Sequence, residues 1–377
     1  MRRTLFALTV ALGAFGAVGS MAQREPTLDE LIAAKKAGPQ PYVLSEWEQA
    51  FVRTEATLYP APEPEFIEAD DGLRLAYREW TPAGWSGSGE IYLIVPGSTS
   101  HSLHLRFLGS ALSDRGILTR VIDFRGTGFS VCENARACGD PAEYTSRVAI
   151  DDGNYFPGRI GDVADANQIA RDLEAHLRDL RGRWPQARVH LSGHSSGGGL
   201  ICRFVEYVGR DQAKELEQLV DSIVLLAPYV HWDYPANTPA NSKYSILHMP
   251  TVMEVARGAT HRYTVGFNLG DRPDDPWAVW KWTQEMAAAM AAYGPTSAWP
   301  HFTVPTAYVI GTREELFDIE KARQQHAKAA SPGPFVVLEG ASHIGMRWRE
   351  DLADFMASFA RGDSLWRSSF RGKSWVR

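Results

Sequence analysis

The residues best suited to chemistry lie in the sequence GHSSG, at positions 193–197. Residues 188–191 are predicted to form a strand that runs into this turn, and residues 200–208 after it are predicted to form a helix. A serine at such a strand-to-helix turn stands exposed at the start of the helix, where the helix dipole favours developing negative charge. The pattern predicts that Ser195 is a nucleophile, and the alternative is a plain glycine-rich connection.

A serine hydroxyl needs a base, and the base needs an acid that orients it. Of the 11 histidines, His343 comes just after the last predicted strand, 335–338, so its loop can reach back to Ser195. His194 is expected to point away from the nucleophile because it is the neighbouring residue on the turn. Surface or packing positions are expected for the remaining histidines that follow Ser195, which are His231, His248, His261, His301 and His326.

The acid is expected in the loop that leaves the predicted strand 307–310. Glu314 is the first carboxylate in this loop and Glu315 is the second. Asp318 is better explained as the N-cap of a predicted helix at 319–330. Asp233, which follows an earlier predicted strand, is the remaining alternative.

Acyl transfer also needs two N–H donors for the oxyanion. One is expected from the backbone of Ser196, and the other from Ser98 in the loop PGST, where Gly97 permits close approach of the backbone. No metal or cofactor is expected. The chain has no His-Glu-x-x-His sequence, and the pair His101 and His104 is expected to have no third ligand nearby.

The elements that must position these residues alternate between strand and helix. A hairpin is predicted first, with strands at 65–69 and 73–80 joined through a turn that ends in Gly72. Further strands are predicted at 91–95, 118–122, 188–191, 223–227, 307–310 and 335–338, and helices at 27–37, 45–58, 102–115, 162–183, 200–208 and 319–330. This alternation predicts an α/β fold with a mostly parallel sheet that helices cover on both faces.

The alternation lapses over residues 229–303, where 12 of 75 residues are aromatic against 11% in the whole chain. This segment reads as loop-rich at first and as helical around 276–292. An insertion between two strands is well placed to cover a pocket at the strand ends. We expect it to be a cap or lid with substrate-binding aromatic residues, the candidates being Trp232, Tyr234, Trp277, Trp280 and Trp282.

Composition excludes several classes of protein. The chain has 377 residues, 44% of them hydrophobic, and a formal charge of −6, which argues against general disorder and against nucleic-acid binding by bulk charge. Only 3 cysteines are present, too few for a cysteine-rich zinc module or a disulfide scaffold.

Residues 1–22 have the pattern of a cleavable signal peptide, with two arginines, an apolar run and small residues before Gln23. The apolar run is too short for a stable membrane span. We therefore expect a periplasmic or secreted protein of mature charge −8. Export permits a local disulfide between Cys132 and Cys138, with Cys202 free and buried.

The expected organisation has six parts. They are a signal peptide (1–22), an N-terminal helical extension (23–64), the first part of an α/β core (65–228), the cap insertion (229–303), the second part of the core (304–361) and a basic tail (362–377) that we expect to be frayed.

The stretch from Gly72 to about Ala360 resembles the α/β-hydrolase superfamily, in particular its monoacylglycerol lipase and lysophospholipase-like group, also labelled serine aminopeptidase S33-like. The segments that carry the resemblance are DGLRL (71–75), residues 97–102, DFRGTGFS (123–130), GHSSG (193–197), residues 311–314 and His343. The resemblance implies a triad of Ser195, Glu314 and His343 beneath a substrate-selecting cap. The chain departs from the family pattern at Pro96, where the family usually has His, and at Glu314, where Asp is usual.

These observations predict an exported serine hydrolase that cleaves small, partly apolar carboxylic esters through an acyl-enzyme. A non-catalytic binding protein with the same fold is a weaker alternative. An exopeptidase is the other alternative, and it needs carboxylates in the cap to hold a free amine. The available ones are Asp233, Glu254, Asp271, Asp274, Asp275 and Glu285.

Overall fold

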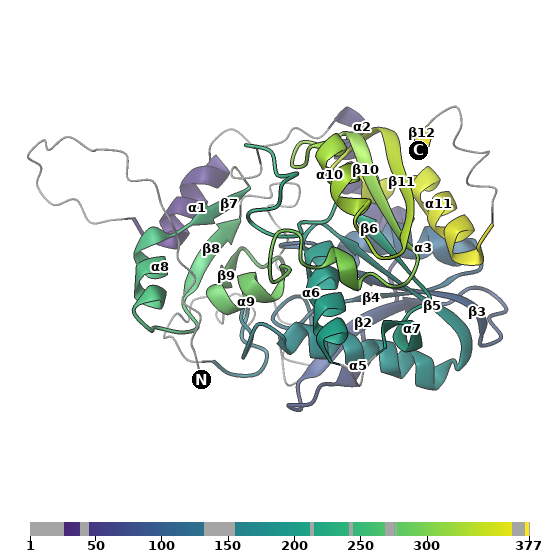
Figure 1. The fold of residues 1–377 in the computed structure, drawn as a ribbon, viewed down its shortest axis with the longest axis horizontal. Coiled ribbons are helices and arrows are strands. Elements are labelled where there is room, and N and C mark those ends of the chain that lie inside the picture. Colours follow the sequence, from purple (N-terminus) through teal and green to yellow (C-terminus); the bar gives the residue numbers. More distant parts are fainter. Residues whose placement is uncertain are drawn as a thin grey trace, which may run out of the picture.

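The computed structural model describes residues 26–37, 45–131, 155–211, 215–240, 244–267, 275, 277–363 and 374–376. At its centre is a nine-stranded sheet with the order β1-β2-β4-β3-β5-β6-β10-β11-β12 (Figure 1). The strands are β1 (Glu65–Glu68), β2 (Arg74–Trp80), β3 (Ser88–Val95), β4 (Leu118–Ile122), β5 (Gln186–His194), β6 (Ser222–Leu226), β10 (Thr306–Arg313), β11 (Pro332–Ser342) and β12 (Ser374–Val376).

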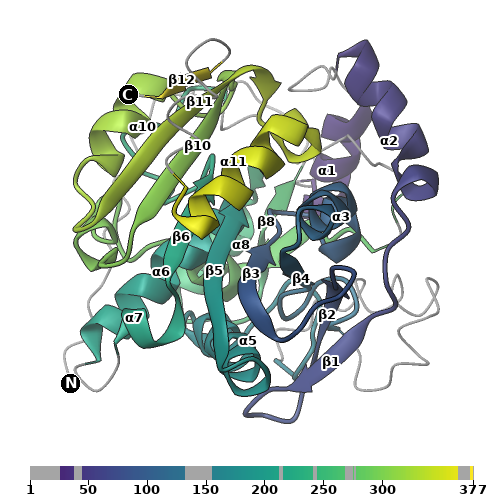
Figure 2. The same cartoon turned by 90° about the vertical axis from the view of Figure 1, so that its right-hand side faces the viewer.

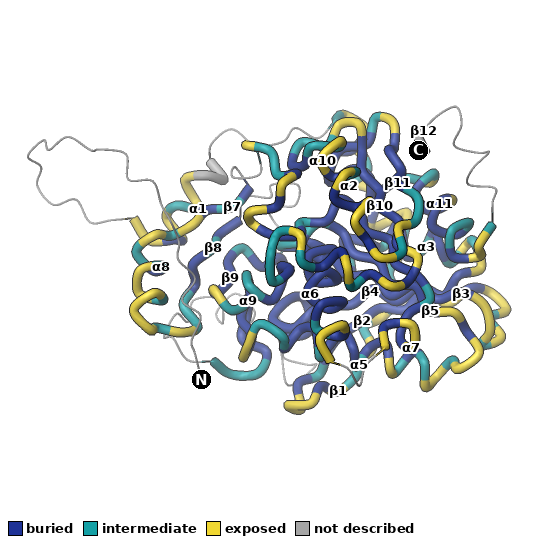
Figure 3. The backbone as a smooth tube through the Cα atoms, in the orientation of Figure 1, coloured by how far each residue is buried: buried dark blue, intermediate teal, exposed yellow. Residues whose placement is uncertain are grey.

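The six strands from β4 to β11 pair in parallel, and β1, β2 and β12 add antiparallel strands at the edges. Helices must cover both faces because such parallel strands are apolar on both sides. In β3, for example, every residue from Ile91 to Val95 is fully buried. Figure 3 shows the dark blue, buried strands at the centre and the yellow, exposed positions on the outer helices and loops.

The helices lie in two layers around this sheet. Helices α3 and α11 pack together in front of the sheet in Figure 2, and α5 packs with α6 on the other side. The helices are α1 (Leu28–Ala37), α2 (Glu46–Leu58), α3 (Arg106–Asp114), α5 (Gln168–Arg183), α6 (Ser196–Arg210), α7 (Leu216–Leu219), α8 (Met249–Ala256), α9 (Gln284–Ala289), α10 (Ile319–His326) and α11 (Glu350–Arg361), with short 3₁₀ helices η1 (Ser102–Leu105), η4 (Trp299–His301) and η5 (Gly345–Trp348).

Several expected boundaries were wrong. The helix expected over 102–115 is two helices, η1 and α3, and the helix expected over 162–183 begins only at Gln168. The helix expected over 319–330 ends at His326. Part of the tail that we expected to be frayed, Ser374–Val376, pairs with β11.

The segment 229–303 contains a small antiparallel sheet that the sequence did not predict. Its strands are β7 (Ser245–Leu247), β8 (Tyr263–Phe267) and β9 (Lys281–Thr283), and α8 and α9 pack against it. Figure 1 places this sheet beside the main sheet, with α1 from the N-terminal extension lying against it. Lys281 joins the two parts through its ammonium group, 3.2 Å from Asp29 Oδ1.

Two expectations concern residues that the structure does not describe, and a third concerns Cys202, which it does describe. The predicted signal peptide and the predicted pair Cys132 and Cys138 lie outside the described residues. Cys202 is free and buried, as predicted. Among the described residues, no helix has both the length and the apolar character needed to cross a membrane.

Candidate active site

Ser195 lies between the end of β5 and the start of α6, in a strained backbone conformation with φ 54° and ψ −122°. Its N–H donates to the carbonyl of Leu226, and its own carbonyl accepts from the N–H of Tyr229 at 2.8 Å. A methyl group at Gly197 would lie 2.4 Å from the carbonyl oxygen of Val95. Glycine is therefore required beside the serine, and the side chain of Ser195 is only half-buried.

The imidazole of His343 is bonded to Glu314 in a fully buried environment. Its Nδ1–H donates to Glu314 Oε1 at 2.9 Å, with Oε2 at 3.1 Å. The two residues meet because β10 and β11 are parallel neighbours and both loops leave the same end of the sheet. Burial alone would lower the pKa of His343, but the charge of Glu314 and its hydrogen bond outweigh burial and raise that pKa.

The other candidate acids are engaged elsewhere. Glu315 accepts the backbone N–H of His343 at Oε2, 3.1 Å away, and burial raises the pKa of its carboxyl group. Asp318 caps α10 by accepting the N–H of Lys321, as predicted. Asp233 is exposed. In this geometry Glu314 is the carboxylate that can orient the imidazole.

His194 supports the loop that carries His343, which could not be predicted from its position on the turn. Its Nε2–H donates to the carbonyl of His343 at 2.8 Å, and the two rings lie 4.8 Å apart between centroids. Burial, together with nearby His343 and Arg347, holds the pKa of His194 well below its ordinary value. His194 therefore supports the loop that carries His343 as a neutral donor.

The remaining histidines hold packing or surface positions. His326 is buried and donates to the carbonyl of Thr306 at 2.7 Å.

No hydrogen bond joins Ser195 Oγ to the His343 ring, although the structure describes both residues. Such catalytic hydrogen bonds often tighten only when substrate binds.

The loop after β3 comes close to Ser195, as the oxyanion site requires. A methyl group at Gly97 would lie 3.1 Å from the Cβ of Ser195, so the backbone of this loop touches the nucleophile. The hydroxyl of Ser98 donates to the Ser196 hydroxyl at 2.8 Å. The two predicted oxyanion donors, Ser98 and Ser196, are thus held against each other beside Ser195.

The N-terminal extension supports the base loop, which the sequence did not indicate. Ser45 and Glu48 form a capping box at the start of α2. Glu48 also accepts the hydroxyl of Ser342, the residue next to His343. The same hydroxyl accepts the N–H of Gly345 at 2.9 Å. The buried carboxylate of Glu48, which belongs to the N-terminal extension and not to the α/β core, thereby holds the turn on which His343 lies.

The aromatic candidates of the cap divide into two groups. Tyr234 and Trp282 are buried core residues, so the expectation that they bind substrate is corrected. Trp282 packs edge-on against Phe267 with centroids 4.6 Å apart. Trp232 is exposed, while Trp277 and Trp280 are half-buried, and these three remain candidates for substrate contact.

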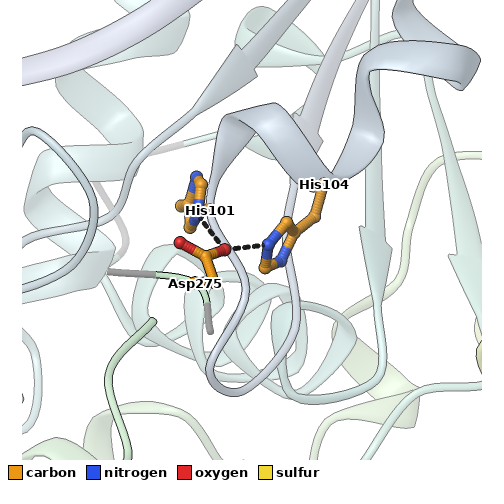
Figure 4. A group of neighbouring side chains, drawn as sticks. All are labelled: His101, His104 and Asp275. Carbon is orange, nitrogen blue, oxygen red and sulfur yellow. Dashed lines mark hydrogen bonds and ion pairs between the residues drawn. The ribbon is translucent and has the colours of Figure 1, made fainter. Parts of the chain in front are cut away.

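The expectation that His101 and His104 have no third ligand nearby was wrong. Figure 4 shows both imidazoles facing the carboxylate of Asp275, which belongs to the segment between β8 and β9. The three donor atoms lie within 4.8 Å of one another. Burial alone would raise the pKa of Asp275, but hydrogen bonds from both imidazoles hold it well below its usual range.

Comparisons with known proteins identify the family and the fold of this chain. A family model described as "Serine aminopeptidase, S33" matches residues 89–346, more than half of the chain. No curated protein matches the chain.

Solved structures show the same fold at low sequence identity. A soluble variant of monoglyceride lipase from Saccharomyces cerevisiae, solved with a substrate analog, has a TM-score of 0.59 at 14% identity, covering 86% of this chain and 99% of that chain. Est1E from Butyrivibrio proteoclasticus, solved with ferulic acid, has a TM-score of 0.52 at 16% identity, covering 80% and 99%. A monoacylglycerol lipase from Paleococcus ferrophilus has a TM-score of 0.51 at 15% identity, covering 75% and 98%. The predicted resemblance is confirmed, and the chain belongs to the serine aminopeptidase S33 family of the α/β-hydrolase fold.

Proposed function

We propose that the protein is a serine hydrolase that cleaves carboxylic esters through an acyl-enzyme. The observation that carries the proposal is the buried hydrogen bond between His343 and Glu314 beside the strained turn of Ser195. A buried imidazole paired with a carboxylate is a base whose tautomer is fixed, with Nε2 left to accept a proton. The lipase and esterase structures that share the fold support an ester as the substrate.

The proposed reaction has two halves. Ser195 Oγ attacks the acyl carbonyl and its proton passes to Nε2 of His343, while Glu314 holds Nδ1–H. The backbone N–H groups of Ser98 and Ser196 stabilise the oxyanion. Collapse of the intermediate expels the alcohol, which takes the proton from His343. Water then repeats the sequence on the acyl-enzyme and restores Ser195.

The aromatic side chains of the segment 229–303 that are not fully buried support a partly apolar substrate. Trp277 stacks on Phe129 with centroids 4.6 Å apart and remains half-buried, and Trp232 is exposed. Such side chains offer apolar surface to an acyl chain or a ring. We propose that this aromatic surface of the segment 229–303 acts as the lid that selects the acyl group.

We also propose that the protein is exported, because residues 1–22 combine arginines, an apolar run and small residues. The test is the N-terminal mass of the protein recovered from outside the cytoplasm. A mature chain that begins at residue 23 supports the proposal, and an intact Met1 in that fraction contradicts it.

The decisive test of the reaction combines Ser195→Ala with the control Ser86→Ala, an exposed serine in a surface turn. Hydrolysis of p-nitrophenyl acyl esters should fall by about 10⁵-fold or more in Ser195→Ala, because nucleophile and base act as a unit. A fluorophosphonate should label the wild type and Ser86→Ala, but not Ser195→Ala. Unchanged turnover in Ser195→Ala contradicts the proposal, and faster cleavage of aminoacyl anilides than of esters identifies the exopeptidase instead.

A further inference from the structure

His101 and His104 form a pair of buried imidazoles that the proposed reaction does not use. His101 is the N-cap of the 3₁₀ helix η1 and His104 lies within it, and the N–H of His104 donates to the carbonyl of His101 at 3.0 Å. Side chains three residues apart are eclipsed on a 3₁₀ helix, so both rings leave on the same side. The two histidines therefore present their Nε2 atoms side by side.

Asp275 completes the cluster from a distant segment of the chain. Its Oδ2 accepts the Nε2–H of His101 at 2.8 Å and also the Nε2–H of His104. Among the described residues, the only ion-pair partners of Asp275 are these two histidines. The cluster therefore joins an anionic oxygen to two imidazole nitrogens, and no lysine or arginine of the described residues forms an ion pair with Asp275.

The surrounding residues fix the orientation of the donors. The N–H of Trp277 donates to Asp275 Oδ1 at 2.9 Å, which leaves Oδ2 facing the imidazoles. The Ser100 hydroxyl lies 3.1 Å from Nδ1 of His104. Asp123 accepts the N–H of Ser102 at 2.6 Å and so anchors the start of η1. Hydrogen bonds to the far side of the ligands are the usual supports of a protein metal site, and here they reach His104 and Asp275, whereas Nδ1 of His101 is buried without a hydrogen-bond partner among the described residues.

We propose that His101 Nε2, His104 Nε2 and Asp275 Oδ2 bind a divalent transition-metal ion of the zinc class. Two imidazoles and one carboxylate are a donor set that zinc accepts, with a fourth position left for water. Tetrahedral zinc separates neighbouring donor atoms by about 3.3 Å, so the ion requires His101 Nε2, which lies 2.8 Å from Asp275 Oδ2, to move outward by about 0.5 Å and His104 Nε2 to move outward as well. The ring protons then lie on Nδ1, where His104 can donate to Ser100.

A second grouping of the same residue types shows why this cluster is the better site. Asp162, His261 and Glu285 also gather within metal-binding distance. There, however, Arg159 Nη1 lies 3.0 Å from Asp162 Oδ2 and supplies the positive charge. A cation at that cluster would lie next to a buried guanidinium that already neutralises Asp162. His261→Gln is therefore a matched control for His104→Gln.

A bound ion would connect the loop after β3 with the segment between β8 and β9. His101 lies three residues after Ser98, the proposed oxyanion donor, and Asp275 lies two residues before Trp277 of the proposed lid. The ion would thus tie the lid to the loop that stabilises the oxyanion. The binding site itself does not depend on the proposed ester hydrolysis, because metal binding is measured without turnover.

The test is calorimetric titration of the chelator-treated, full-length protein with Zn²⁺, followed by the absorption spectrum of the Co²⁺ form. We expect one Zn²⁺ per chain in the wild type and in His261→Gln. Asp275→Asn and His104→Gln should each weaken binding by about 100-fold or more, and Ser100→Ala by about tenfold, since second-shell losses typically cost 10–100-fold. Asp275→Asn keeps the side-chain shape, so a folded variant is available for the comparison.

Two results would overturn the proposal. One is a wild type that binds no Zn²⁺, in which case the cluster is a hydrogen-bonded latch that only holds the two segments together. The other is Zn²⁺ affinity that is the same in the wild type, Asp275→Asn and His104→Gln, which would place the ion elsewhere. A Co²⁺ spectrum typical of octahedral coordination by water and exposed carboxylates would lead to the same conclusion.

Discussion

The end of the main sheet and the segment 229–303 differ in what determines their structure, which is the local backbone geometry at the sheet end and contacts between distant segments in 229–303. At the sheet end, the turn around Ser195 and the pair His343 and Glu314 lie where the strand pattern placed them. In the segment 229–303, a three-stranded sheet was missed and two of five candidate aromatic residues are buried in the core. A motif can therefore be predicted from the sequence when a single backbone geometry requires it. It cannot be predicted when contacts between distant segments determine the structure.

After the loss predicted for Ser195→Ala, the largest expected effect tests the sheet end through its acid. Glu314→Gln should reduce kcat for ester hydrolysis by about 10³–10⁴-fold, because the imidazole loses the partner that fixes its tautomer. Glu315→Gln, Asp318→Asn and Asp233→Asn should stay within about tenfold, as none of them contacts the His343 ring. Steady-state kinetics of the four variants measure this. A large loss in Asp233→Asn would show that the acid comes from the earlier strand.

The next effect tests the segment 229–303 by comparing two of its tryptophans. Trp282 is 3% exposed and Trp232 is 63% exposed. Trp282→Ala should therefore lower the free energy of unfolding by about 3–5 kcal/mol. Trp232→Ala should change it by no more than about 0.5 kcal/mol. Urea denaturation measures both.

The same two variants separate packing from specificity. Only Trp232→Ala is expected to change the preference among ester chain lengths without changing stability. If Trp232→Ala leaves that preference unaltered, the exposed indole is not part of a substrate-selecting lid.

The smallest effect concerns the pH dependence of the base. The raised pKa of His343 means that the neutral, reactive imidazole forms only above the ordinary histidine value. The kcat/KM for esters should therefore rise with pH through a midpoint above about 6.5. His194 stays neutral in this range because burial lowers its pKa, so it should add no second midpoint.

Glu314→Gln removes the charge that raises the pKa of His343, so the residual activity should have its midpoint at lower pH. Rate profiles of the two proteins from pH 5 to pH 9 make the comparison. A midpoint that does not move would mean that Glu314 does not control the ionisation of His343.

The sequence predicted most of the core because its signals are local. The alternation of strands and helices, the glycines around Ser195 and the N-cap at Asp318 each depend on a few adjacent residues. The support of His343 by His194 and of its loop by Glu48 could not be predicted in the same way. These contacts join residues 149 and 294 positions apart, and no local pattern specifies such pairs.

The cluster of His101, His104 and Asp275 illustrates the same limit. The spacing of the two histidines was visible, but the third residue lies 171 positions further on and belongs to a segment whose sheet was not predicted. A carboxylate of the exopeptidase alternative, Asp275, is committed to two imidazoles instead of being free to hold an amine. A sequence alone shows which residues could be ligands, and the fold decides which of them meet.

The sheet order also governs when the active site exists during folding. The turn around Ser195 can form once β5 pairs with its neighbours. His343 takes its place only when β10 and β11 join the sheet beyond β6. Contacts between such distant parts of the chain form slowly, because a long loop must close before they are gained. During synthesis the serine is therefore in place well before the base, and the ability to hydrolyse a substrate appears only when the C-terminal strands have docked.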